Sequence, residues 1–576
     1  MDLLDVALYF VIGIAVIVGA GIFSKKLGIA TPLFLIVIGG LLSFVPGAPV
    51  RVPGELILLV LLPPILYASA ISVPVVDLRR NLPSIGVLSV LLVIATAFIT
   101  GVVLWALLPG ISLAAAVAVG AVVSPTDAVA ATAVAKRFGL PPRLVTILEG
   151  ESLVNDATAL VLLRSALAAT AATVSFWDGV GDFLFAASAA IAIGLVVGFV
   201  TVQLRSRIRD PLVDTAISFA VPFVAFLPAE EIGASGVIAV VTAGLYSGYH
   251  ASGRFTPQAR ATERTNWRSI QFLLENGVFL LMGLEVTQIV GTVRSDDLSV
   301  PIAIALGFLI AVVLVATRYL FIGPLILVLR WRERRAMRRH ERHLAYVDAL
   351  PDPSTLPPRA AKRYDMVQRS LERRGNDLKE LSAEGLGWRG GVILGWAGMR
   401  GVVTLAAAQS LPDTILHRDQ LVLVAFTVAV VTLLVQGGTL PWLIRLTGIQ
   451  GSDAAADRRE LASLLEELGD AGLQVLSDPP ADGEPVDPVI LEQVRRDTVT
   501  GSQIMRERVD ADGDAAALAA APHARYRALR YEVLQAERQA LLMARSAGRY
   551  PSRIIARAQT MLDIEETRLA QFDENT

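Results

Sequence analysis

The sequence contains no cysteine in its 576 residues, which excludes disulfides and thiolate metal sites. Charged residues are also scarce, at 18% compared with about 25% in a typical soluble domain. The five histidines, His250, His340, His343, His417 and His523, all lie outside the middle of any apolar run. We interpret His340 and His343 as solvated loop residues, so the sequence gives no sign of a histidine metal centre.

The chain is instead rich in long runs of hydrophobic residues. Hydrophobic residues make up 54% of the sequence, and the mean hydropathy is +0.57. The apolar residues gather into runs of roughly twenty, which is the length a helix needs to cross about 30 Å of hydrocarbon. The sequence therefore predicts an all-α polytopic protein of the lipid bilayer. The thirteen expected spans are Val6–Phe23, Thr31–Phe44, Glu55–Ser72, Ser84–Leu108, Leu113–Ala135, Ile147–Thr170, Val180–Leu204, Leu212–Leu227, Ala234–Tyr249, Ile270–Val290, Pro301–Leu329, Gly390–Leu411 and Leu421–Leu446.

Basic residues alternate along the connections between these runs. The intervening connections contain little beyond Arg51, Arg294 and Arg418. Because cytoplasmic connections carry an excess of Lys and Arg, this alternation places the N-terminus outside and the C-terminus in the cytoplasm of a cell membrane. An odd number of spans is then required, which thirteen satisfies. The basic connections contain Lys25, Lys26, Arg79, Arg80, Lys136, Arg137, Arg143, Arg205, Arg207, Arg209, Arg254, Arg260, Arg264 and Arg268.

Composition divides the chain into four parts. Residues 1–329 form the first part of a transmembrane domain, and residues 389–450 contain its last two spans. Residues 330–388 are a strongly basic connection, expected near anionic headgroups of the cytoplasmic leaflet. Residues 451–576 form a cytoplasmic tail with helical patterns near 458–468, 525–547 and 552–572. The tail shows no nucleotide-binding or catalytic motif.

The sixth span carries polar residues that a bilayer tolerates poorly. It reads ILEGESLVNDATALVLLR from Ile147 to Arg164. A charge at the centre of a bilayer costs about 2.5–3.5 kcal/mol on insertion scales, so intramembrane carboxylates usually have a function. Ser152 and Asp156 are one helical turn apart, and Glu151 and Asn155 form the neighbouring pair. A hydroxyl and a carboxylate on one face offer hard oxygen ligands for a small cation or a proton. The alternative is a helix end at the interface with its acids in water.

Two other spans contain breaks. In the fifth, Pro125 lacks an N–H and disfavours helical backbone at Ser124, so the helix is expected to stop there and to restart after Thr126 and Asp127. In the twelfth, Arg400 lies mid-span between Gly398 and Gly401, where a buried guanidinium needs a carboxylate or carbonyl partner. A simple proline kink and a snorkelling arginine are the alternatives.

The two breaks occupy matching places if spans one to six and eight to thirteen form two halves. The halves then run in opposite directions, and paired interrupted spans indicate a binding site at the midplane of an inverted-repeat transporter. The breaks are expected to cross there. Asp127 would face positive half-helix ends, and Arg400 would face negative ones.

Three sequence motifs are similar to those of a known protein family. SPTDAVA at Ser124–Ala130, EGESLVNDA at Glu149–Ala157 and GWAGMRGVVTLA at Gly395–Ala406 together resemble the monovalent cation:proton antiporters, in particular the electroneutral sodium/proton exchanger branch. The resemblance covers roughly Val6 to Leu446. It implies a thirteen-span fold with a dimer-forming scaffold and a mobile core, partners limited to lipid and a second copy of the chain, and no nucleic acid, no cofactor and no enzymatic activity.

The resemblance also implies roles for individual residues. Asp156 would bind either the cation or the proton, with further oxygens from Ser152 and Thr126 completing a Na⁺ site. Glu151 would pair with Arg400, while Asp127 stabilises the crossing and Asn155 holds the site together. Many relatives have an acid where this chain has Ala68, so the site here would have one carboxylate fewer.

Three further intramembrane charges, Arg164, Glu285 and Arg318, have no role in this scheme. We expect Arg318 to pair with a core carboxylate, and Arg164 and Glu285 to lie near the outer interface.

Two protease interpretations are weaker. GASG at Gly233–Gly236 has the form of a rhomboid nucleophile motif, but no histidine lies mid-span to act as its base. An aspartyl dyad of Asp127 and Asp156 would have no need of Arg400.

The functional hypothesis is an antiporter that exchanges a monovalent cation, Na⁺ above Li⁺ or K⁺, for H⁺ by alternating access. Exchange of one charge for one charge would be electroneutral and would serve pH and sodium homeostasis. The alternatives are K⁺/H⁺ exchange or a cation channel on the same fold, and a membrane ion sensor that signals through its tail.

Overall fold

The computed structural model describes residues 3–27, 30–45, 53–171, 176–293, 299–348 and 386–449, with scattered positions between 357 and 375 and between 459 and 565. Contacts divide the chain into two units, Met1–Gly451 and Ser452–Thr576. In the second unit Arg530 donates hydrogen bonds to Glu565. Most of the helices expected in the tail lie outside the described residues.

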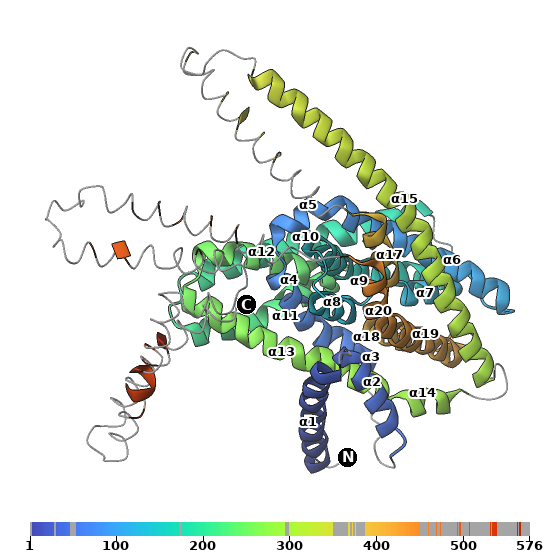
Figure 1. Ribbon diagram of the computed structural model, residues 1–576. Coiled ribbons are helices and arrows are strands. Elements are labelled where there is room, and N and C mark those ends of the chain that lie inside the picture. Colours follow the sequence, from blue (N-terminus) through green and yellow to red (C-terminus); the bar gives the residue numbers. More distant parts are fainter. Residues whose placement is uncertain are drawn as a thin grey trace. The chain divides into compact units, whose positions relative to one another are not determined.

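The first unit is a helical bundle (Figure 1). No strand occurs in the described residues, which agrees with the predicted all-α class. Its first half consists of α1 (Leu3–Leu27), α2 (Thr31–Leu42), α3 (Gly54–Leu56), the π-helical η1 (Ile57–Leu61), α4 (Leu62–Ser72), α5 (Val75–Gly86), the π-helical η2 (Val87–Leu91), α6 (Leu92–Leu107), α7 (Leu113–Val123), α8 (Ala128–Arg137), α9 (Pro142–Ala171) and α10 (Phe176–Arg205).

The second half continues with α11 (Pro211–Glu231), α12 (Gly236–Arg254), α13 (Pro257–Leu284), α14 (Val286–Thr292), α15 (Val300–Asp348), α17 (Trp388–Trp396), α18 (Val402–Gln409), α19 (Arg418–Thr432), the π-helical η4 (Leu433–Gly437) and α20 (Gly438–Thr447). Each of the thirteen expected segments contains helix, and two of them, Leu113–Ala135 and Gly390–Leu411, are interrupted. By length and apolarity alone, seven of the described helices can cross a membrane, or eight if α13 and α14, bent by 43°, count as one span. The chain is thus a multi-pass membrane protein, and the number thirteen and the inverted repeat stay predictions.

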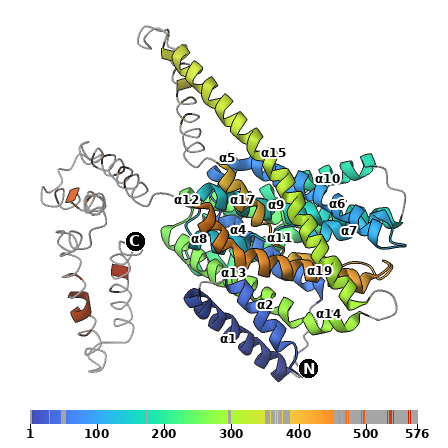
Figure 2. The ribbon, with the colours of Figure 1, turned by 45° about the vertical axis from the view of Figure 1, so that its right-hand side comes forward.

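Two expected boundaries differ from the structure. The charge pattern places Arg260, Arg264 and Arg268 in a connection, but they lie on α13, which begins at Pro257. Thr256 caps this helix by accepting a hydrogen bond from the backbone N–H of Ala259. The basic connection after residue 329 begins as a continuation of α15, so the helix has 49 residues where about twenty suffice to span a bilayer. Its C-terminal part projects beyond the other helices of this unit (Figures 1 and 2).

The helices pack as two groups. In the first, which we call the scaffold group, α1–α4 pack with α10–α14; α13 lies along α2, and α12 lies between α4 and α10. In the second, the site group, α5–α9 pack with α15 and α17–α20; α7 lies between α6 and α9, and α19 lies between α15 and α18. Contacts within each group are far more extensive than those between the groups.

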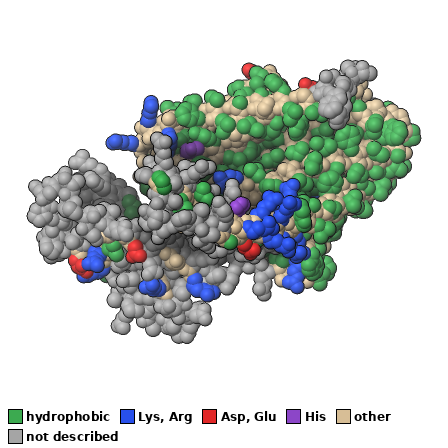
Figure 3. Space-filling model, turned by 90° about the horizontal axis from the view of Figure 1, so that it is seen from above, with side chains coloured by type: hydrophobic (Ala, Val, Ile, Leu, Met, Phe, Trp, Pro, Cys, Tyr) green, Lys and Arg blue, Asp and Glu red, His purple; other side chains and the backbone are tan. Residues whose placement is uncertain are grey.

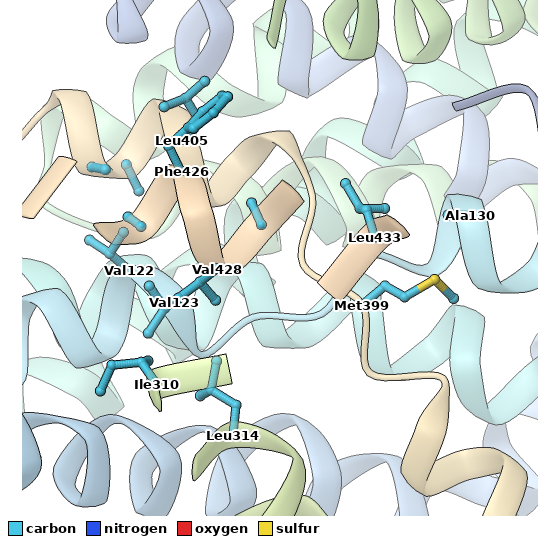
Figure 4. Close-up of a cluster of buried hydrophobic side chains, with 14 of the residues drawn as sticks. Val122, Val123, Ala130, Ile310, Leu314, Met399, Leu405, Phe426, Val428 and Leu433 are labelled. Carbon is cyan, nitrogen blue, oxygen red and sulfur yellow. The ribbon is translucent and has the colours of Figure 1, made fainter. Parts of the chain in front are cut away.

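Apolar side chains cover much of the outer surface of the bundle (Figure 3). Inside, one large hydrophobic cluster contains side chains of both groups. Figure 4 shows part of it: Val122 and Val123 of α7, Ile310 and Leu314 of α15, and Met399 between α17 and α18. The interior is thus packed around the two places where helices are interrupted.

Candidate ion-binding site at the crossing of two broken helices

The first break separates α7 from α8. Helix α7 ends at Val123, and residues 124–127 are not helical. Pro125 has no N–H to offer the carbonyl of Ala121; that carbonyl instead accepts a hydrogen bond from the Ser124 hydroxyl at 2.9 Å. Asp127 restarts the chain as α8, its Oδ1 accepting a hydrogen bond from the backbone N–H of Val129 at 2.8 Å. The helix stops where the sequence predicted, but the expectation that Pro125 disfavours helical backbone at Ser124 is wrong, because Ser124 keeps helical dihedral angles (φ −76°, ψ −37°).

The second break separates α17 from α18, and Arg400 lies within it, 2% exposed. Its guanidinium donates to the carbonyl oxygens of Val123, at 3.0 Å, and of Gly398. These carbonyls belong to the C-terminal ends of α7 and α17, which carry partial negative charge. The backbone N–H of Arg400 donates to Thr432 Oγ1 at 3.1 Å, which ties the break to α19. The prediction that Arg400 faces negative half-helix ends is confirmed.

The two breaks cross in direct contact. The backbone N–H of Asp127 donates to the carbonyl of Met399 at 2.7 Å, while Arg400 reaches back to Val123. Gly401, the residue before α18, lies against the Asp127 side chain: a Cβ built on it would stand 2.5 Å from Asp127 Oδ2. Asp127 therefore lies at the N-terminal ends of α8 and α18, where helix dipoles favour a negative charge. Only glycine leaves room for that approach.

Helix α9 brings the candidate carboxylate to this crossing. Asn155 is fully buried, and its side-chain amide donates to Thr126 at both Oγ1 (2.8 Å) and the backbone carbonyl (3.3 Å). The next residue, Asp156, is 6% exposed, and Ser152 lies one turn earlier, half-buried. Thr126 is thus joined to the helix that carries Ser152 and Asp156.

Glu151 does not pair with Arg400; that expectation is wrong. Its carboxylate instead accepts two hydrogen bonds from the guanidinium of Arg318 on α15, one of them at 2.8 Å, and a third from the Thr126 hydroxyl at 2.9 Å. Arg318 also donates to the carbonyl of Leu394 at 2.9 Å, and a Cβ on Gly398 would stand 2.6 Å from Arg318 Cδ. The expectation that Arg318 pairs with a core carboxylate is confirmed. The sequence signal was its place in the middle of an apolar run.

This arrangement occupies Arg318 and Arg400 and leaves Asp156 and Asp127 with no basic partner among the described residues. Within the described parts of the chain, no basic side chain pairs with Asp156 or Asp127. Buried carboxylates without a counter-charge favour binding of a proton or a cation. The site therefore has the chemistry to hold one positive charge, supplied from outside the protein.

The remaining residues singled out in the sequence lie around this site. Ala68 on α4 is buried and shares a hydrophobic cluster with Leu153 and Ala157 of α9, so no acid from the third span reaches this region. Arg164 of α9 pairs with Glu230 of α11. Glu285, 3% exposed, accepts a hydrogen bond from the side chain of Gln409 at 2.7 Å.

Sequence reasoning missed a buried cluster of charged side chains, which lies where α10 ends and where α11 and α13 begin. Arg205 makes a two-pronged pair with Asp214, at 2.9 and 2.8 Å, and donates to Glu263 at 2.8 Å. It joins the end of α10 and the start of α11 to α13. Nothing in the spacing of these residues along the chain signals that they meet.

A family model described as "Sodium/hydrogen exchanger, transmembrane" matches residues 12–446. The chain belongs to the sodium/hydrogen exchanger family. The exchanger is also 31% identical over 566 residues to an uncharacterized Na⁺/H⁺ exchanger of Mycobacterium bovis, with 96% of this chain and 94% of the relative covered. Its relatives are transporters, so the exchanger is a cation/proton antiporter of this family and not an enzyme.

One further sequence relative and one solved structure resemble this chain. The Na⁺/H⁺ antiporter ApNhaP of Aphanothece halophytica is 28% identical, with 77% of each chain covered. The exchanger resembles the solved structure of the sodium proton antiporter MjNhaP1 from Methanocaldococcus jannaschii, with a TM-score of 0.56 at 16% identity, covering 78% of this chain and all of that one. At this identity the structural likeness speaks for the fold alone.

Proposed function

We propose that the exchanger swaps one Na⁺ for one H⁺ at Asp156. The observation that carries this proposal is a buried carboxylate beside crossed helix breaks, with no basic side chain paired to it in the described residues. Arg318 is held by Glu151, and Arg400 by backbone carbonyls, so the positive charge at Asp156 has to come from a bound ion. A sodium ion and a proton compete for the same oxygen atoms.

The ion site is proposed to contain Asp156, Ser152 and Thr126. All three offer hard oxygen ligands, which suit a small monovalent cation. The Thr126 hydroxyl donates to Glu151 and accepts from Asn155, which leaves one lone pair for an ion. Asn155 and Glu151 thereby orient Thr126, and Asp127 stabilises the crossing on which α9 rests.

One-for-one exchange follows from the charge count. Asn155, next to Asp156, is neutral and is committed to Thr126 through its amide hydrogens. The site would then return one proton for each sodium ion. We place the exchanger in the cell membrane with its N-terminus outside, in agreement with the basic residues of the connections. In this orientation, α9, α11, α13 and α18 end on the outer side. Assembly as a homodimer and packing of the tail on itself or on the second subunit belong to the same proposal.

The deciding experiment is sodium-driven pH change in proteoliposomes. The Asp156→Asn variant is expected to lose exchange while keeping the thermal stability of the unaltered protein. Exchange at the normal rate in that variant would remove Asp156 from the mechanism. Thr158→Ala is a matched control, because Thr158 lies on the same helix, is buried, and bonds only to the Val154 carbonyl among the described contacts.

A second candidate cation is K⁺. A Bacillus subtilis relative named as a sodium, potassium, lithium and rubidium/H⁺ antiporter is 30% identical over 277 residues, although only 46% of this chain is covered. Adding Na⁺, Li⁺ and K⁺ in turn to the same vesicles separates the two. A channel would carry current in this assay, and a sensor would show no exchange at all.

A further inference from the structure

In the part of the chain that the structure describes, two side-chain hydrogen bonds join a helix of the scaffold group to a helix of the site group. Arg164 on α9, a site-group helix, pairs with Glu230 on α11, a scaffold-group helix. Gln409, the last residue of α18, donates from its side chain to Glu285, between α13 and α14, at 2.7 Å. Each contact joins a helix of the ion site to a helix of the other group.

Both contacts lie at the same end of the bundle. Helices α11 and α13 run in the same direction, because the first part of α11 is joined to the first part of α13 through the Arg205 cluster and through the hydrogen bond from Trp267 to Ser218. Glu230 and Glu285 lie where α11 and α13 end, so both contacts are at one end of the bundle. By contrast, the ion pairs at the other end lie within one group. Arg205 with Asp214 and Glu263 belongs to the scaffold group, and Arg143 with Glu333 belongs to the site group.

A close backbone approach strengthens the same junction. Gly54, at the start of α3 in the scaffold group, lies directly against α18. A Cβ on Gly54 would stand 2.6 Å from the carbonyl oxygen of Ala406 and 3.1 Å from Gln409 Cβ. Any other residue would push α3 away from α18, so the two groups meet here as closely as backbones allow.

We propose that the Arg164–Glu230 and Glu285–Gln409 contacts form a latch that closes the outer end of the ion site and opens once in each transport cycle. The inference rests on the proposed antiport, because exchange requires that Asp156 face each side of the membrane in turn. Because both contacts and the Gly54 approach join the two groups, opening toward this end has to break all three. The latch favours the state that is closed on this side, and weakening it shifts the balance toward the state that is open there.

The first test is labelling, which needs no transport. The natural chain has no cysteine, so a Thr158→Cys variant carries a single thiol, on α9 between Asp156 and Arg164. A membrane-impermeant maleimide added from the outer side reports how often that stretch is open. Adding Glu230→Gln and Glu285→Gln is expected to raise the labelling rate about threefold or more, because the charges that close the junction are removed. Gln at position 230 still accepts the hydrogen bond that Glu230 Oε1 receives from the Gly236 N–H.

The matched control is Asp419→Asn. Asp419 pairs with Arg418 within the site group, so its loss should leave the labelling rate unchanged. An unchanged rate in the Glu230→Gln/Glu285→Gln protein would overturn the latch.

The second test is cross-linking. A short bis-maleimide joining Arg164→Cys to Glu230→Cys is expected to stop exchange. The same reagent joining Gln203→Cys to Arg254→Cys, a contact within the scaffold group, should leave exchange intact. Normal exchange by protein fully cross-linked between 164 and 230 would overturn the latch. If the labelling rate rises but no cation is exchanged for protons, the latch stands and the proposed antiport fails, so the two outcomes are separable.

Discussion

Arg318 of α15 and Glu151 of α9 form a salt bridge inside the site group, and their side chains are only 2% and 1% exposed. Thr126 donates to the same carboxylate, and the Ser89 hydroxyl donates to the backbone carbonyl of Glu151 at 3.1 Å. The pair therefore joins α15, α9, the first break and η2. A buried pair of this kind is costly to disrupt on one side only, because the remaining charge is left without a partner.

The first prediction concerns this pair. Arg318→Ala is expected to lower the free energy of unfolding by about 3–5 kcal/mol, because it strands the Glu151 carboxylate in an apolar interior. Combining it with Glu151→Gln should cost less than Arg318→Ala alone, since the stranded charge is then removed. Thermal unfolding of the purified protein in detergent measures both. Arg335→Ala, on the exposed part of the same helix, is a control expected to change stability by less than about 0.5 kcal/mol.

A double variant that is as unstable as the sum of its two single variants would argue against the Arg318–Glu151 pair. Arg400→Ala offers a further comparison. Its loss should not be relieved by Glu151→Gln, because Arg400 bonds to the carbonyls of Val123 and Gly398.

The second prediction concerns the crossing. Gly401→Ala places a methyl group about where the Asp127 carboxylate now lies, so the two breaks have to move apart. We expect exchange to fall at least tenfold, measured as sodium-driven pH change in vesicles. Gly438→Ala, with nothing within 4 Å of the added Cβ, is the matched control and should be neutral or stabilising by up to about 1 kcal/mol. Full activity of the Gly401→Ala protein would show that the close approach of Gly401 to Asp127 is not needed for transport.

The third prediction concerns voltage. If one Na⁺ replaces one H⁺, no net charge crosses the membrane, and the exchange escapes the roughly 2.3 kcal/mol per charge that each 100 mV imposes. The rate of sodium-driven pH change should then be the same with and without an imposed membrane potential. A rate that changes steeply with the potential would mean unequal charge movement.

Much of this protein could be read from its sequence, for identifiable physical reasons. A bilayer fixes the length of apolar segments, so each expected span contains helix in the structure. Pro125 ends α7 because it lacks an N–H, and an arginine in the middle of an apolar run has to find a partner. These are local constraints, and they act on residues a few positions apart.

The partners in the ion pairs between residues far apart in the chain could not be predicted from the sequence. Two intramembrane arginines, Arg318 and Arg400, were candidate partners for Glu151. The family resemblance favoured Arg400, but the structure pairs Glu151 with Arg318. The choice depends on which guanidinium lies nearer the end of a half-helix, where free carbonyls satisfy it, and this is a property of the crossing. Likewise, Arg164, Glu285 and Gln409 gained a role only when their helices were seen to end on the same side.

The sequence by itself determined that this chain lies in a membrane, where its helices break, and that an intramembrane acid follows Asn155, because hydrocarbon restricts composition and backbone locally. The tertiary structure alone decided which charges neutralise each other and which carboxylate is left for an ion. Such pairings bring together residues up to 277 positions apart, as with Arg400 and Val123, and no local rule reaches that far.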